Sequence, residues 1–272
     1  MQQRQVFTRD DVRDLRSHGF LVITHREPNF VRKRATILFD GLEAIEADAS
    51  VRKVFFDGRP NKKHGRLVQG YFEKPEDAMA QFNFESFADD RINEYRRNVS
   101  RSDFDPFFGA FEELNRYART IIEALARVLD NPLVREHSEY KIADLLTDAT
   151  TITSVTKYRA KAGTSQTSAM PNTAAGAFYW LVEDNPGMQI LGRHGQVVDV
   201  SVIETDPSKG IFVPGDNLSL VTENMIEASL HPIIPQKEGE MRPTLRTFVY
   251  FKHALMERLK RKQESVNDIL RG

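Results

Sequence analysis

The stretch AFYWLVEDNPGMQILGRHGQVVDV, residues 177–200, decides the fold class that we expect for the second half of the chain. Its short apolar runs are separated by Asn185-Pro-Gly187 and His194-Gly195, residue types that favour turns. Similar runs occur at 151–158, 210–214, 218–222 and 245–251. Many short strands at such spacing are typical of a sandwich or barrel.

Helical patterns surround this β-rich part. The clearest covers residues 105–129, where apolar residues recur with the 3.6-residue period of an amphipathic helix. Asp105 is the predicted N-cap and Pro106 lies in the first turn. We interpret the apolar stripe as the face that packs on a sheet. Shorter helices are expected after Thr8, at 30–47 and at 252–270, and a buried strand at 20–23.

The composition excludes several classes of protein. The chain has 272 residues, with 38 Lys and Arg against 39 Asp and Glu, and it has no Cys. The balanced charge gives no reason to expect nucleic acid as a partner, and the lack of Cys excludes disulfides and thiolate chemistry. We find neither an apolar segment long enough to span a bilayer nor a signal peptide. We therefore expect a cytoplasmic protein without a membrane partner, and we leave a homo-oligomer open.

An ordered series of landmarks runs through the β-rich part. The series comprises Tyr158, Asn172-Thr-Ala-Ala-Gly176, Phe178-Tyr-Trp-Leu181, Asp184, Gly187-Met-Gln-Ile190, Gly215-Asp216, Ala228-Ser-Leu-His231 and Arg242-Pro-Thr244, preceded by His18-Gly-Phe20 and Gly70-Tyr71. This order resembles the isopenicillin-N-synthase-like branch of the iron(II)/2-oxoglutarate-dependent oxygenase superfamily, over roughly residues 5–255.

The resemblance implies a fold and a domain plan. The family fold is a double-stranded β-helix, or jelly roll, so we expect a mainly β chain with flanking helices. We expect a helical or mixed region at 1–145, the jelly-roll core at 146–252 and a C-terminal helix at 253–272, all in one integrated domain.

The chain departs from the family at the metal site. The family binds iron(II) with two His and one carboxylate. The register from Gly176 and Asp184 puts Asn172 at the first His position and Ala174 at the carboxylate position, which leaves His231 as a remnant. We therefore expect no cofactor bound in the family's usual manner, with iron(II) and 2-oxoglutarate as the alternatives.

The family's carboxylate site is better preserved. The resemblance implies that Arg242 and Thr244 hold the distal carboxylate of 2-oxoglutarate, and that Tyr158 adds a hydrogen bond. A guanidinium suits this role because it can make a bidentate, charge-assisted contact. Residues two apart on a strand share one face, and Arg246 is a second candidate of the same parity. A surface salt bridge is the alternative reading.

Three functions remain open at this point, and whether the chain is an enzyme is undecided. The first is a small-molecule-binding protein, or a metal-independent enzyme of the cyclisation or elimination type, in a biosynthetic pathway. Its ligand would be a small organic molecule, such as an acid held by Arg242. The second is an active non-haem iron oxidoreductase with unusual ligands. The third is a structural or interaction protein.

Overall fold

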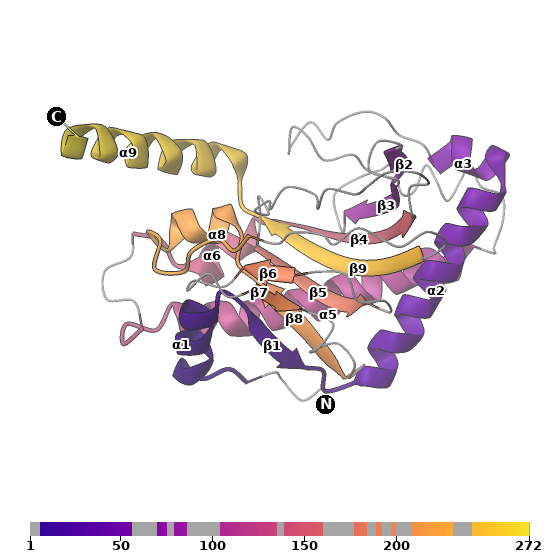
Figure 1. The fold of residues 1–272 in the computed structure, drawn as a ribbon, viewed down its shortest axis with the longest axis horizontal. Coiled ribbons are helices and arrows are strands. Elements are labelled where there is room, and N and C mark those ends of the chain that lie inside the picture. The colour runs from indigo at the N-terminus through magenta and orange to yellow at the C-terminus, as the bar shows by residue number, and fades with distance from the viewer. Residues whose placement is uncertain are drawn as a thin grey trace.

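The computed structural model describes residues 6–55, 70–74, 79–85, 104–134, 139–159, 177–183, 189–191, 197–199, 208–230 and 241–271. These residues form a large antiparallel sheet with helices packed against it (Figure 1). The sheet has seven strands in the order β1-β8-β5-β9-β4-β3-β2. Their bounds are β1 Leu21–Thr24, β2 Gly70–Lys74, β3 Met79–Glu85, β4 Thr150–Arg159, β5 Ala177–Glu183, β8 Lys209–Val213 and β9 Met241–Tyr250.

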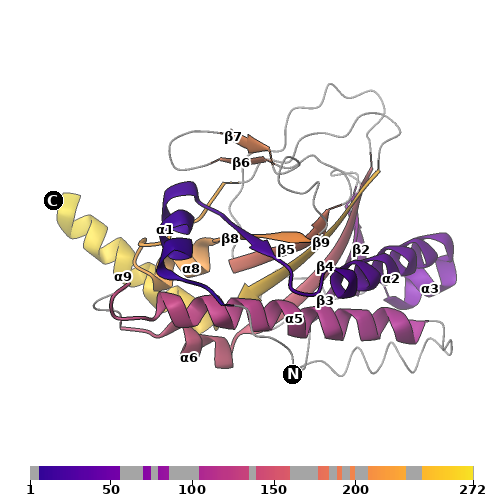
Figure 2. The ribbon, with the colours of Figure 1, turned by 90° about the horizontal axis from the view of Figure 1, so that it is seen from below.

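A second, smaller sheet lies on one side of the large one. It consists of β6 (Gln189–Leu191) and β7 (Val197–Asp199), which pair antiparallel. Figure 2 shows this pair on one side of the large sheet and α5 (Asp105–Leu129) on the other. The described antiparallel strands agree with the expected architecture. The described helices contain more residues than the strands, so the expectation of a mainly β chain is met only in part.

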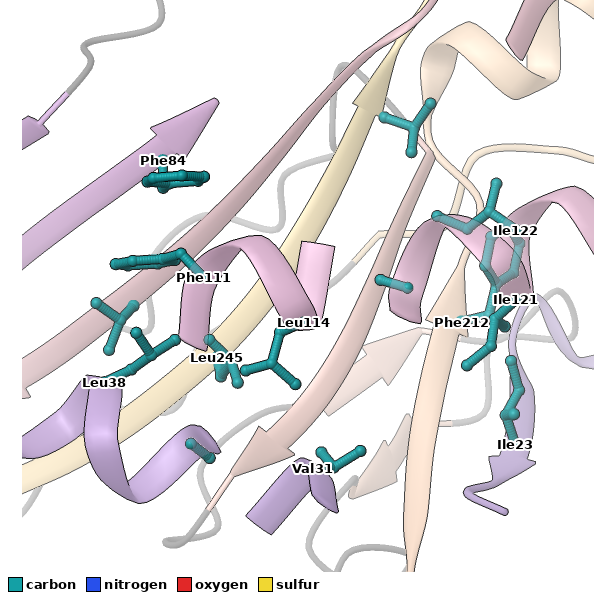
Figure 3. Close-up of a cluster of buried hydrophobic side chains, with 14 of the residues drawn as sticks. Ile23, Val31, Leu38, Phe84, Phe111, Leu114, Ile121, Ile122, Phe212 and Leu245 are labelled. Atoms are coloured by element: carbon teal, nitrogen blue, oxygen red, sulfur yellow. The ribbon is translucent and has the colours of Figure 1, made fainter. Parts of the chain in front are cut away.

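The hydrophobic core lies between the sheet and α5. Every third or fourth residue of α5 is buried, because an amphipathic helix turns one stripe toward its partner. In Figure 3 the rings of Phe84 on β3 and Phe111 on α5 lie parallel, with centroids 5.1 Å apart. Phe82 stacks on the same Phe111 ring at 5.5 Å, and Leu245 of β9 is buried in the same core. The aromatic run around residues 82–84 is therefore core.

Further helices cover the edges of this core. They are α1 (Arg9–His18), α2 (Pro28–Ala47), α3 (Ala49–Phe55), α6 (Ile142–Thr147) and α8 (Asp216–Val221). The C-terminal helix α9 (His253–Arg271) extends away from the sheet (Figure 1). None of the helices in the described ranges is long and apolar enough to cross a membrane.

Helix α1 shows how local sequence sets helix ends. Thr8 and Asp11 form a capping box, in which the Asp11 backbone N–H donates to Thr8 Oγ1 and the Thr8 backbone N–H donates to Asp11 Oδ2. Gly19 ends the helix with a φ of 82°, a conformation that glycine adopts without steric cost. At α5 the expectation needs correcting: Phe104 is the N-cap and Asp105 lies in the first turn. In the first turn its negative charge still interacts favourably with the helix dipole.

One predicted strand is wrong. Residues 218–222 were expected to be extended, but they belong to α8 and its C-cap. Short apolar runs do not distinguish a strand from a buried helical turn by periodicity alone. Asp216 in the first turn, directly after the extended Gly215, favours the helix.

Candidate functional site

The large sheet has one apolar and one polar face across its central strands. Neighbouring residues of a strand point to opposite faces. Phe82 and Val155 turn toward α5, so Gln81, Ser154 and Thr156 turn to the other side. We call this other side the polar face. Its members are Gln81, Asn83, Ser154, Thr156, Tyr158, Thr244 and Arg246.

The strand register brings these residues into adjacent rows. One row pairs Gln81 with Thr156 and Thr156 with Thr244. The next row pairs Asn83 with Ser154 and Ser154 with Arg246. Cross-strand partners have Cβ atoms about 5 Å apart, so polar groups from three strands converge on one small area. The β6–β7 pair lies on this side of the sheet (Figure 2).

Arg246 is the central cation of the polar face. Its Nη2 donates to Tyr158 Oη at 3.1 Å and to Thr156 Oγ1 at 3.2 Å. Its guanidinium carbon lies 5.6 Å from the centroid of the Phe248 ring. Its Nε is buried and has no hydrogen-bond partner among the described residues. An unpaired buried donor on a charged group is costly, and buried Arg is normally paired with an anion.

A second hydrogen-bonded group lies beside Arg246. Gln81 Nε2 donates to Asn83 Oδ1 at 2.6 Å and to Ser154 Oγ at 2.5 Å. Ser154 Oγ lies 3.4 Å from Thr156 Oγ1, which accepts the bond from Arg246. The amide of Gln81 and the guanidinium are thus linked through two hydroxyl groups.

Burial around Arg246 also affects Tyr250, the last residue of β9. Desolvation by burial raises the pKa of Tyr250 to about 12, and the positive charge of Arg246 partly opposes this rise. The phenol of Tyr250 is therefore neutral at physiological pH.

The structure brings some of the expected carboxylate-site residues together. The backbone of Tyr158 pairs with that of Arg242, and Thr156 pairs with Thr244. The Arg242 side chain falls outside what the structure describes. Thr244 is buried, with 2% of its surface exposed. Arg246 is the guanidinium that contacts Tyr158.

The expected metal positions are not tested by this geometry. Asn172, Ala174 and His231 all lie outside the described residues. Within the described ranges no group of three or more His, Asp or Glu side chains could hold a metal ion.

Sequence reasoning missed Gln81, Asn83, Ser154 and Thr156 as site residues. The signal is present in the stretch MAQFNFE of β3, where polar Gln81 and Asn83 alternate with Phe82 and Phe84. Alternation of this kind indicates a strand with two different faces. The polar residues of β4 can be assigned to the same face as Gln81 and Asn83 only when the strand register is known.

No model of a known protein family matches the chain, and no curated protein matches it. Solved structures do match. AtDAO1, the dioxygenase for auxin oxidation 1 from Arabidopsis thaliana, in a binary complex with 2-oxoglutarate, superposes with a TM-score of 0.67 at 14% identity over 90% of this chain and 88% of its own. A full-length Neurospora crassa protein in complex with alpha-KG gives 0.64 at 13% identity over 90% and 78%. JOX2 with 2OG, Fe and JA gives 0.60 at 13% identity over 89% and 70%.

The chain therefore has the fold of the iron(II)/2-oxoglutarate oxygenases. The likeness is one of fold and does not single out the isopenicillin-N-synthase-like branch. The expectation that this chain takes no cofactor in the family's usual manner is contradicted, because these neighbours hold 2-oxoglutarate and, in JOX2, iron. That expectation rested on the two altered iron-ligand positions, whereas a cationic side chain can bind a carboxylate without a metal. Arg246 Nε, which has no hydrogen-bond partner among the described residues, fits such a carboxylate.

Proposed function

We propose that this chain is a small-molecule-binding protein of the oxygenase fold, and that it binds a dicarboxylic acid of the size of 2-oxoglutarate at the polar face. Arg246 holds one carboxylate, with Tyr158 and Thr156 fixing the guanidinium. By their match to the family motif, Arg242 and Thr244 also contribute to binding the acid. The observation that carries the proposal is the buried Arg246 Nε without a hydrogen-bond partner in the described ranges.

Without a ligand, the surroundings of the Arg246 guanidinium are energetically unfavourable. Nη2 of Arg246 is occupied by two neutral hydroxyl groups, which do not neutralise its charge. No acidic side chain forms an ion pair with Arg246 within the described ranges. A carboxylate would supply both the acceptor and the negative charge that the described residues do not provide. Charge-assisted hydrogen bonds of this kind are about twice as strong as neutral ones.

The test is a calorimetric titration with two acids that differ at one end. 2-Oxoglutarate carries the distal carboxylate, and 2-oxopentanoate has a methyl group in its place. We expect 2-oxoglutarate to bind about tenfold more tightly or better, because one charge-assisted contact is worth about 1.5–3 kcal/mol. In the variant Arg246→Gln the two acids should bind alike. Equal binding of both acids to the unaltered chain would contradict the proposal.

We further propose that the chain has a jelly-roll core, and that its metal triad is altered. The support is the family register, in which Asn172 and Ala174 stand at two ligand positions. An amide is a weak ligand and a methyl group is none, so fewer groups would hold the ion. The double variant Asn172→His with Ala174→Asp should bind iron(II) at least about tenfold more tightly than the unaltered chain, because metal affinity follows ligand number and geometry. An unchanged iron affinity would contradict the register.

The altered triad supports a non-redox reaction on the bound molecule, of the cyclisation or elimination type. The second candidate is an iron-dependent oxidation, which the iron and 2-oxoglutarate of JOX2 favour. Anaerobic addition of iron(II) and 2-oxoglutarate separates the two. A visible charge-transfer band, followed by consumption of 2-oxoglutarate in air, supports oxidation. Turnover of a substrate without oxygen supports the non-redox reaction.

A further inference from the structure

Gln81 is a residue of the polar face whose position suits direct contact with a ligand. It lies on β3, one strand away from Thr156 of β4, which accepts a hydrogen bond from Arg246. Gln81 keeps 9% of its surface exposed, whereas Ser154 and Thr156 are completely buried. Of these three polar side chains, Gln81 is therefore the one whose surface a ligand could contact.

The hydrogen bonds of Gln81 determine what it can offer to a ligand. A side-chain amide has two N–H donors and one carbonyl acceptor. Both donors of Nε2 are committed, one to Asn83 and the other to Ser154. The carbonyl oxygen Oε1 receives no hydrogen bond from the described residues. Gln81 is thus fixed in orientation by its neighbours and presents an acceptor.

Resting on the proposed acid-binding function, we propose that Gln81 is a specificity-determining residue that accepts a hydrogen bond from the ligand. The ligand class is then a small dicarboxylic acid with an O–H or N–H donor, such as a hydroxy acid or an amino acid. Arg246 binds its carboxylate and Gln81 Oε1 binds its donor. Sites built to hydrogen-bond a ligand group discriminate strongly against analogues that lack it, because the buried polar atom is then left unpaired.

Three five-carbon diacids test this directly. Glutarate has no group at carbon 2, 2-oxoglutarate has an acceptor there, and 2-hydroxyglutarate has a donor. Their affinities for the full-length chain are measured by calorimetry in the unaltered protein and in Gln81→Met, which keeps the side-chain length and loses the acceptor. We expect Gln81→Met to weaken 2-hydroxyglutarate about tenfold and to leave the other two acids within about twofold.

A matched control lies on the opposite face of β4. Thr153→Val removes a buried hydrogen bond to Thr247, 3.0 Å long, on the side that faces α5. It should leave the affinities of all three diacids unchanged. Should Gln81→Met fail to fold, the unaltered chain still tests the role, because it should bind 2-hydroxyglutarate more tightly than glutarate or 2-oxoglutarate.

The outcomes separate this inference from the proposed function. If Gln81→Met weakens all three diacids equally, or none of them, the role of Gln81 is wrong. The same holds if the unaltered chain binds 2-hydroxyglutarate no more tightly than glutarate. The acid site itself stands in each case, provided that 2-oxoglutarate still binds more tightly than 2-oxopentanoate through Arg246. If none of the diacids binds at all, both proposals are wrong.

Discussion

Replacing Arg246 by Met separates a ligand-binding arginine from a structural one. In the unaltered chain Arg246 makes two hydrogen bonds to neutral hydroxyl groups, and its buried Nε has no partner among the described residues. The variant loses the two bonds, worth about 1 kcal/mol each, and removes an unsatisfied donor that costs about 1–3 kcal/mol. These terms nearly cancel. We therefore expect the free energy of unfolding without ligand to change by no more than about 1 kcal/mol.

The effect on ligand binding should be large. At a concentration of 100 Kd a ligand stabilises its protein by about 2.7 kcal/mol. For a chain of this size that corresponds to a rise in Tm of about 5–10 °C. A thermal-shift assay with 2-oxoglutarate should show this rise in the unaltered chain and lose most of it in Arg246→Met.

Arg119 of α5 provides the matched control. It donates to the Leu146 carbonyl oxygen and to Thr151 Oγ1, and it pairs with Glu123 at 2.8 Å. Arg119→Met should lower the stability by about 1.5–3 kcal/mol, because it loses hydrogen bonds worth about 1 kcal/mol each and removes no unsatisfied donor that would offset the loss, and should keep the ligand-induced rise. The reasoning is refuted if Arg246→Met lowers stability as much as Arg119→Met and keeps the rise.

Two further predictions concern packing and pH. Gly41→Ala should destabilise the chain by about 1–3 kcal/mol, because an added Cβ would clash with the Phe107 ring, whereas Gly109→Ala meets nothing within 4 Å and should be neutral or slightly stabilising. Chemical denaturation measures both, and equal losses would contradict the packing of α2 on α5. Burial raises the pKa of Tyr117 from 10.0 to about 12. The unfolded chain therefore loses this proton first, so stability is complete below about pH 10 and declines between about pH 10 and 12. Tyr117→Phe should reduce that decline, and an unchanged pH profile would show that burial does not shift this group.

Local signals account for the helices that sequence reasoning found. The expected bounds of 105–129 match α5, because its apolar stripe runs without interruption from Phe107 to Leu129. The expected helix after Thr8 matches α1, since Thr8 and Gly19 mark its ends chemically. These features depend only on residues close in sequence. The predicted turns at Asn185-Pro-Gly187 and His194-Gly195 lie outside the described residues.

Long-range pairing explains what was missed. β3 becomes a strand of the large sheet because it pairs with both β2 and β4, and its sequence neighbourhood contains no hint of the second partner. The same pairing places Gln81 beside Ser154, 73 residues away. The even spacing of Arg242 and Arg246 along the strand placed both on one face, but it did not indicate which of them binds the carboxylate. Only the geometry shows that Arg246 contacts Tyr158.

A crystal structure of the chain with 2-oxoglutarate tests most directly whether Arg246 holds a carboxylate. We predict a carboxylate oxygen within about 3 Å of Arg246 Nε, with Nη2 still bonded to Thr156 and Tyr158. An acid bound elsewhere, together with an Nε that is bonded to a protein group, would contradict the central claim.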